Sequence, residues 1–175
     1  MGSLAYPFNP PHIEKQILQQ ELKAIGKKTE VGFVFNPFNG DLIDYVQGNE
    51  REVTFKKVIP NMVVSHFHPK GDSFTRHDLV NTIKLEALEM RAFGEDYLYV
   101  FRGVLENVSL EKLEAYWEEN PVHSIYIDDN RKLKVSRNVE KDKHLYWQCV
   151  SKELGFIYVR EDRQRCIDEL AKSRH

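Results

Sequence analysis

The stretch VVSHFHPKGDSFTRHD holds two histidines, His66 and His68, that are separated by one residue and followed by Asp78. The run MVVS before the first histidine predicts a short strand that ends at His66. Residues two apart in a strand point to the same side, so both imidazoles would face one point while Phe67 faces the core. Two histidines and one carboxylate, with a fourth position open to water, are typical of a catalytic zinc site. Zinc in such a site lowers the pKa of its water to about 7.

The same residues also fit an ordinary polar loop. A single His-x-His pattern is common, and Thr75-x-x-Asp78 has the spacing of a capping box, with Thr75 as N-cap and Asp78 in the first turn of a helix. The two interpretations exclude each other only in part. The side chain of Asp78 can face the histidines while its backbone belongs to the start of the helix. From these residues alone, both a metal site and a capped loop stay open.

Apolar periodicity predicts the elements that position these residues. The first part of the chain is expected to contain a helix at 12–25 closed by Gly26, strands at 30–35, 42–46, 52–59 and 62–65, a helix at 75–93 and a strand at 97–101. The connection between the second and third of these elements carries Asn39-Gly40, which favours a hairpin. In the long predicted helix, Leu79, Ile83 and Met90 share a face.

The last third of the chain has a mixed pattern. It predicts a helix near 110–119, short strands at 124–127 and 132–135, a helix at 144–155, a strand at 156–159 and a charged terminal helix. We therefore expect an α+β protein with one main sheet. Its parts would be an N-terminal tail (1–11), a core (12–108) and a small α/β extension (109–175) packed on the core.

Composition places the chain among ordinary globular proteins. It has 175 residues, of which 41% are apolar and 30% charged, and its formal net charge is -2. Such a charge gives no overall field that attracts nucleic acid or an anionic membrane. No apolar run is long enough to span a bilayer, and the N-terminus lacks the pattern of a secretory signal. We expect a cytoplasmic, reducing location, with Cys149 and Cys166 as buried thiols.

The motif as a whole resembles a known signature. HFHPKGDSFTRHD is similar to the His-x-His-Pro…Ser-x-x-Asp pattern of JAB/MPN domains, the JAMM zinc metallopeptidase superfamily. In that superfamily a glutamate precedes the first core strand, and TEVGFVF puts Glu30 in its place. The resemblance covers about residues 12–102. It implies a cytidine-deaminase-like fold, in which a central mixed β-sheet is flanked by helices.

The resemblance implies a role for each matching residue. His66, His68 and Asp78 would be the zinc ligands. Glu30 would take a proton from the attacking water as general base and return it as general acid. The substrates of the superfamily are peptides and ubiquitin-like proteins joined through amide bonds.

Two departures from the pattern concern the oxyanion. The interval from Pro69 to Thr75 is one residue shorter than in the usual eukaryotic and RadC-like forms, and threonine replaces the serine that steadies the oxyanion. Thr75 keeps a hydroxyl, and Ser73 is a candidate substitute. The shorter interval resembles JAB-like domains of phage-head (MuF-type) and polymorphic-toxin proteins, and this likeness extends to about residue 162.

The sequence therefore predicts a zinc-dependent peptidase or isopeptidase acting on a peptide or ubiquitin-like protein. One alternative is a JAB-like binding or scaffold protein without turnover, which the short loop and Thr75 motivate. Another is a RadC-like, DNA-associated protein, which the lack of net positive charge disfavours. The oligomeric state does not follow from the sequence.

Overall fold

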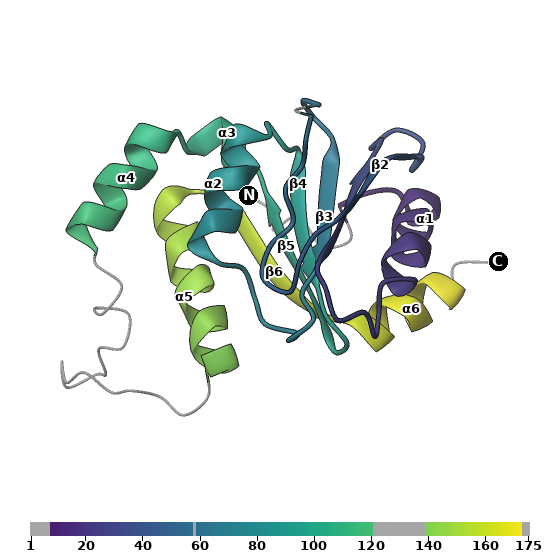
Figure 1. The fold of residues 1–175 in the computed structure, drawn as a ribbon. Coiled ribbons are helices and arrows are strands. Elements are labelled where there is room, and N and C mark those ends of the chain that lie inside the picture. The colour runs from purple at the N-terminus through teal and green to yellow at the C-terminus, as the bar shows by residue number, and fades with distance from the viewer. Residues whose placement is uncertain (1–7, 58, 121–138, 173–175) are drawn as a thin grey trace.

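A computed structural model describes residues 8–57, 59–120 and 139–172, and it has one six-stranded mixed sheet with helices on both faces (Figure 1). The elements in chain order are α1 (Pro11–Leu22), β1 (Val31–Phe35), β2 (Leu42–Gln47), β3 (Val63–Phe67), α2 (Arg76–Lys84), β4 (Glu89–Phe93), β5 (Tyr97–Arg102), α3 (Val104–Asn107), α4 (Leu110–Glu119), α5 (Val139–Leu154), β6 (Ile157–Asp162) and α6 (Arg163–Lys172). The predicted α+β class is confirmed.

The order of the strands across the sheet is β2-β1-β3-β4-β5-β6. Neighbouring strands are antiparallel except β3 and β4, which are parallel. A parallel pair needs a crossover connection, and α2 supplies it. The crossover places the start of α2 directly beyond the end of β3, where the two histidines lie.

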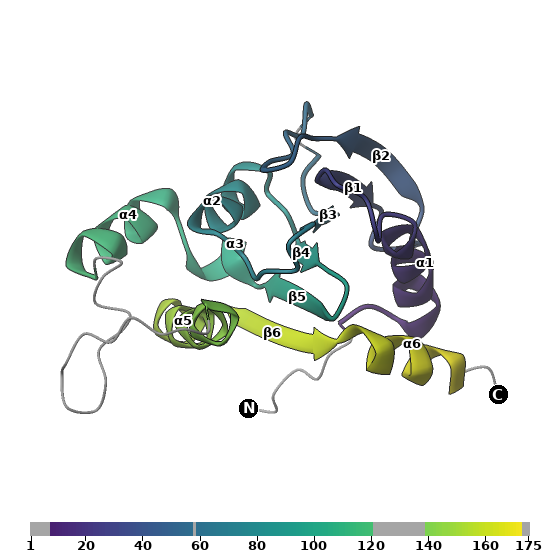
Figure 2. The ribbon, with the colours of Figure 1, turned by 60° about the horizontal axis from the view of Figure 1, so that its bottom comes forward.

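The sheet separates two apolar clusters. Alternate residues of β5 show this, because Leu98 and Val100 belong to the cluster under α1, whereas Tyr99 and Phe101 belong to the cluster that also contains residues of α2 and α5. Figure 2 shows α1 and α6 on one side of the sheet and α2, α3 and α5 on the other. The central strands are therefore buried on both faces.

The predicted helix 75–93 is wrong in its second half. α2 gives way to β4 after a turn in which Glu86 has a φ of 50°, outside the helical region. Every residue of β4 is buried, as a central strand requires. Leu79, Ala87 and Met90 nevertheless lie in one apolar cluster. Their helical spacing thus reflects a shared cluster and not one continuous helix.

The strand predicted at 52–59 is also wrong, since the described residues 52–57 form no strand. Their alternating apolar side chains cover the sheet instead of extending it. A Cβ atom built on Gly32 would lie 2.5 Å from the ring of Phe55 and 3.1 Å from a methyl group of Val53. Only glycine at this position of β1 lets the segment lie so close to the sheet.

The C-terminal third agrees with several predictions. α4 and α6 appear where they were expected, α5 begins earlier than predicted, and β6 matches the predicted strand at 156–159 within a few residues. The strands predicted at 124–127 and 132–135 lie outside the described residues. β6 pairs with β5, so the predicted extension contributes a strand to the main sheet.

Two smaller findings complete the comparison with the sequence. Both cysteines are free, but only Cys166 is buried, and Cys149 is exposed, contrary to the prediction. Among the described residues, no helix combines the length and apolar character needed to cross a membrane.

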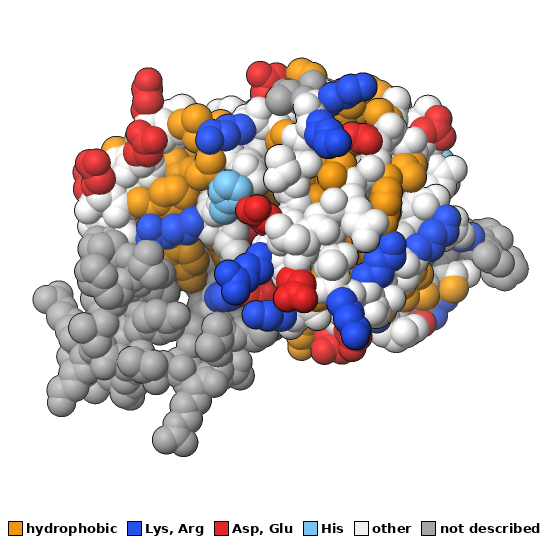
Figure 3. Space-filling model, viewed as in Figure 1, with side chains coloured by type: hydrophobic (Ala, Val, Ile, Leu, Met, Phe, Trp, Pro, Cys, Tyr) orange, Lys and Arg blue, Asp and Glu red, His pale blue; other side chains and the backbone are white. Residues whose placement is uncertain are grey.

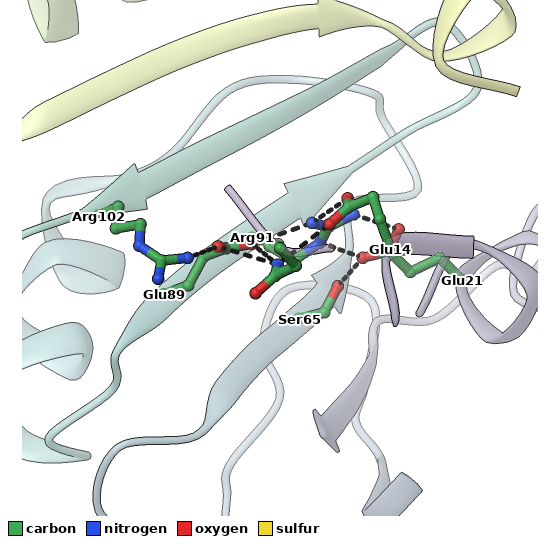
Figure 4. A network of polar contacts seen from close by, with 7 residues as sticks. Glu14, Glu21, Ser65, Glu89, Arg91 and Arg102 are labelled. Atoms are coloured by element: carbon green, nitrogen blue, oxygen red, sulfur yellow. Dashed lines mark hydrogen bonds and ion pairs between the residues drawn. The ribbon is translucent and has the colours of Figure 1, made fainter. Parts of the chain in front are cut away.

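A buried network of charges fixes α1 to the sheet (Figure 4). The fully buried guanidinium of Arg91 donates to Glu14 and Glu21 of α1 and to Glu89 of its own strand, at 2.6–3.1 Å. Glu21 also accepts a hydrogen bond of 2.6 Å from Ser65 of β3. Burial of so many charges is costly unless each is paired, so the network depends on its central cation.

We predict that Arg91→Met lowers the free energy of unfolding by about 3–5 kcal/mol, because buried carboxylates lose their partner while the side-chain volume is kept. Urea unfolding at neutral pH measures this. Arg165→Met is the matched control, since Arg165 pairs with Glu169 on the exposed face of α6, and it should leave stability essentially unchanged. Equal effects of the two substitutions would contradict the prediction.

Candidate metal centre

The two histidines lie where β3 ends against the start of α2. His66 and His68 are 3% and 5% exposed, and their ring centroids are 4.5 Å apart. Between them, Phe67 points through the sheet into the apolar cluster under α1. The alternation expected of a strand therefore brings both imidazoles to the same face.

A backbone carbonyl orients the ring of His68. Nδ1 of His68 lies 2.7 Å from the carbonyl oxygen of Asp72, which can only accept, so Nδ1 carries the proton. His68 therefore presents an Nε2 lone pair, as histidine ligands of metals do. Burial alone would lower the pKa of His66, but the carboxylates of Asp78 and Glu30 outweigh burial and raise it, so metal binding at His66 would displace a proton.

The carboxylate of Asp78 faces these nitrogens and also starts α2. Its Oδ2 accepts from the amide of Thr75 at 2.6 Å and from the Thr75 hydroxyl at 2.8 Å, which confirms the predicted capping box. Its Oδ1 lies 3.1 Å from Nε2 of His66, and its Oδ2 lies 4.0 Å from Nε2 of His68. The cap and the contact with the histidines thus coexist.

The unsatisfied nitrogen of His66 indicates what the cluster lacks. Although Nε2 is 3.1 Å from Asp78, the angle is not that of a hydrogen bond, and among the described residues only Arg76 has other buried side-chain nitrogens without a partner. A buried polar atom left in this way costs free energy. Ligand atoms of His66, His68 and Asp78 all lie within 4.8 Å of one another, so the group could hold a metal ion.

The charges of the cluster shift the pKa values of its members. Burial alone would raise the pKa of Asp78, but the neighbouring imidazoles and the amide of Thr75 outweigh it and hold that pKa far below the usual range. Burial and the charge of His66 lower the pKa of His68. At neutral pH, Asp78 is a carboxylate and His68 is a neutral imidazole, which are the protonation states that bind metals.

Glu30 comes from the strand next to the histidines. β1 pairs with β3 so that Gly32 lies opposite His66, and continuing this register by two residues places Glu30 opposite His68 on the same face. The backbone of Glu30 is held on both sides, because its amide donates to Asn49 and its carbonyl accepts from Gly48. Burial raises the pKa of its carboxyl to about 7.

These side chains line one open pocket of about 290 Å³. Glu30, His66, His68 and Asp78 lie on one part of its wall, and Arg51, Glu52, Val53, Phe55, Thr75, His77, Asn81 and Met90 complete it. In the space-filling view, a histidine and an acidic side chain lie side by side over α2, with Lys and Arg side chains below them (Figure 3). The cluster is therefore buried within the fold but reachable from solvent.

The two residues predicted to steady an oxyanion are placed differently. Thr75 lines the pocket, but its hydroxyl donates to Asp78. Ser73 is fully buried, is absent from the pocket wall and lies 3.2 Å from the hydroxyl of Tyr158. The structure thus brings Glu30, Thr75 and the three candidate ligands together and leaves Ser73 outside.

Several pocket residues were not found from the sequence. Val53 and Phe55 belong to the segment 52–59 that was predicted as a strand, and Arg51 directly precedes it, so no signal pointed to them. His77 is not one of the residues matched to the motif, yet it lies on the wall with Asn81. These two are four positions apart and flank Asp78 on one face of α2, and that spacing could have identified them.

We predict that Glu30→Gln stabilises the metal-free protein at pH 8 but not at pH 5. Folding raises the pKa of Glu30 from 4.5 to about 7, so the folded protein keeps a proton that the unfolded chain loses, and stability falls as the pH rises between these values. The full shift corresponds to about 3 kcal/mol, but we expect about 1 kcal/mol because water reaches the carboxyl through the pocket. Urea unfolding in the presence of a chelator measures it. An equal gain at both pH values would contradict this assignment.

Comparison with protein-family models, with curated proteins and with solved structures finds no match for the chain. The family membership predicted from the motif therefore stays a prediction. The geometry by itself supports a buried, preorganised group of two imidazoles and one carboxylate that could hold a metal ion beside a titratable glutamate.

Proposed function

We propose that the protein is a zinc-dependent peptidase or isopeptidase of the JAMM type, which hydrolyses an amide bond in a peptide or ubiquitin-like substrate. The observation that carries this proposal is Glu30. Its pKa lies near neutrality, and it shares an open pocket with the candidate metal ligands. A general base works best when its pKa is close to the pH of the reaction.

The donor set favours zinc over calcium and magnesium. Two imidazoles and one carboxylate, with room for water, match catalytic zinc sites, whereas calcium and magnesium prefer oxygen ligands throughout. Zinc–ligand distances of about 2.0–2.1 Å in a tetrahedral site separate the ligand atoms by about 3.3 Å. Oδ1 of Asp78 lies 3.1 Å from Nε2 of His66, Oδ2 lies 4.0 Å from Nε2 of His68, and all the ligand atoms lie within 4.8 Å of one another, so small side-chain movements would bring them to this spacing.

Zinc bound there would polarise the scissile carbonyl and activate a water molecule. Glu30 would take the proton of that water and deliver it to the leaving amine. The two histidines and Asp78 would hold the ion, and the Asp72 carbonyl that accepts from Nδ1 of His68 would keep that ring aimed at it. A pocket of about 290 Å³ is at the lower limit for small-molecule sites, which suits a short stretch of extended chain.

One observation favours the second candidate, a metal-binding scaffold protein without turnover. Thr75 is the one hydroxyl residue on the pocket wall formed by the described residues, and its hydroxyl donates to Asp78. In this arrangement it does not serve a developing oxyanion, and the loss of one such donor costs about 10²–10³ in rate. The RadC-like alternative gains no support from the site, because Glu30, Glu52 and Asp78 would repel a phosphate backbone.

We predict that the purified chain takes up one zinc ion, and that Glu30→Gln keeps the zinc but lowers hydrolysis by about 10²–10⁴-fold, since the proton acceptor is lost while the ligands stay. Chelator competition measures the binding. Internally quenched peptides and an isopeptide-linked ubiquitin-like dimer serve as substrates. Glu52→Gln, on the same pocket wall, is the matched control, and its rate of hydrolysis should stay within a few-fold of the rate of the wild-type protein.

The outcomes separate the candidates. Absence of zinc uptake contradicts the metal centre itself. Zinc uptake without hydrolysis of any substrate favours the scaffold, and hydrolysis that survives Glu30→Gln shows that another group moves the proton.

A further inference from the structure

Three consecutive residues in the loop between His68 and α2 are held by the C-terminal part of the chain. Asp72 pairs with Lys143 of α5, Ser73 contacts Tyr158 of β6, and the carbonyl of Phe74 accepts a hydrogen bond from α5. These contacts join positions about 70–85 residues apart. The loop that connects the candidate ligands is therefore fixed from outside the segment that carries the motif.

Lys143 is connected to the ring of the candidate ligand His68 through Asp72. The carbonyl oxygen of Asp72 accepts from Nδ1 of His68 at 2.7 Å, and one carboxylate oxygen of Asp72 lies 3.6 Å from the same nitrogen. Nζ of Lys143 contacts the other carboxylate oxygen. Both partners are about one-third exposed, so the pair is neither buried nor fully solvated. A change in the position of Asp72 would move the carbonyl that orients His68.

The other two contacts hold the two loop residues that directly follow that carbonyl. Tyr158 lies between Ser73 and His144, with its hydroxyl 3.2 Å from the Ser73 hydroxyl and 3.0 Å from Nδ1 of His144. The indole of Trp147 donates to the carbonyl of Phe74 at 2.8 Å in the core. Both partners of the Lys143 contact are partly exposed, whereas Ser73 and Phe74 are buried, so Lys143 can be changed without opening the core.

We propose that Lys143 is a positioning residue of the metal centre, which holds Asp72 so that its carbonyl keeps Nε2 of His68 directed at the ion. This inference rests on the proposed use of His66, His68 and Asp78 as ligands but not on hydrolysis. Groups that orient the histidine ligands of metals typically change metal affinity by about 10–100-fold when they are removed. Because Lys143 acts through Asp72 and is partly exposed, the lower end of that range is expected.

The test uses the full chain and measures zinc affinity by chelator competition. Lys143→Gln should weaken zinc binding about tenfold, and Lys143→Arg should restore it to within about threefold, since arginine keeps the charge and the reach. Lys152→Gln is the matched control, because Lys152 is an exposed lysine near the other end of α5. The zinc affinity of this variant should equal that of the wild-type protein. All variants should keep the thermal midpoint of the metal-free protein.

A second readout needs no metal. Long-range ¹H–¹⁵N spectra of the metal-free protein report which ring nitrogen of His68 carries the proton. We expect the Nδ1–H form alone in the unchanged protein and in Lys152→Gln, and a mixture of tautomers in Lys143→Gln. Asp72→Asn combined with Lys143→Gln should weaken zinc binding no more than the stronger single change, because both remove the same contact.

The outcomes are distinct from those of the proposed hydrolysis. If Lys143→Gln binds zinc as tightly as the unchanged protein and keeps the single tautomer, the positioning role is overturned. If zinc affinity and tautomer change as expected while no substrate is cleaved, the positioning role stands and the hydrolytic function fails.

Discussion

The carboxylate of Asp78 is the contact on which the candidate site depends. One of its oxygens accepts from the amide and hydroxyl of Thr75 and so fixes the first turn of α2, while the other lies 3.1 Å from Nε2 of His66. Burial opposes a charged carboxylate, yet these partners keep its pKa low. One carboxylate therefore joins the start of α2 to the candidate metal ligands, and neither can move without the other. Because α2 also connects the parallel strands β3 and β4, the constraint extends into the sheet.

Arg91 ties α1 to the strand beside the candidate ligands. Its side chain holds Glu14 and Glu21 under α1, and its strand β4 pairs in parallel with β3, where Ala92 lies opposite His66. The buried charges are costly by themselves. Because these carboxylates need the guanidinium, the network holds α1 against β4 on the face of the sheet opposite the histidines.

The parts of the fold and site that could be predicted are those set by local spacing. The His-x-His pair, the capping box of Thr75 and Asp78, and the strand that follows Glu30 each depend on neighbours within a few residues. The helix expected at 75–93 failed because Leu79 and Met90 reach the same cluster from a helix and from a strand. The strand expected at 52–59 failed because its alternation serves packing over Gly32. In both cases the apolar pattern correctly indicated which side chains are at least partly buried. It did not indicate the backbone conformation that buries them.

The path of the loop after His68 depends on residues that are distant in the sequence, so the motif does not predict it. The loop after His68 turns at Gly71, where φ is 71°, and passes so close to Gly94 that a Cβ there would lie 2.5 Å from the Gly71 Cα atom. This tight path, which only glycine at both positions permits, carries the chain past the end of β4 and places the Asp72 carbonyl at His68. Lys143 of α5 then meets the loop from the region that was predicted as an α/β extension packed on the core. The predicted boundary near residue 108 therefore does not separate the candidate site from the C-terminal part of the chain, since Lys143 of α5 pairs with Asp72, whose carbonyl accepts from His68.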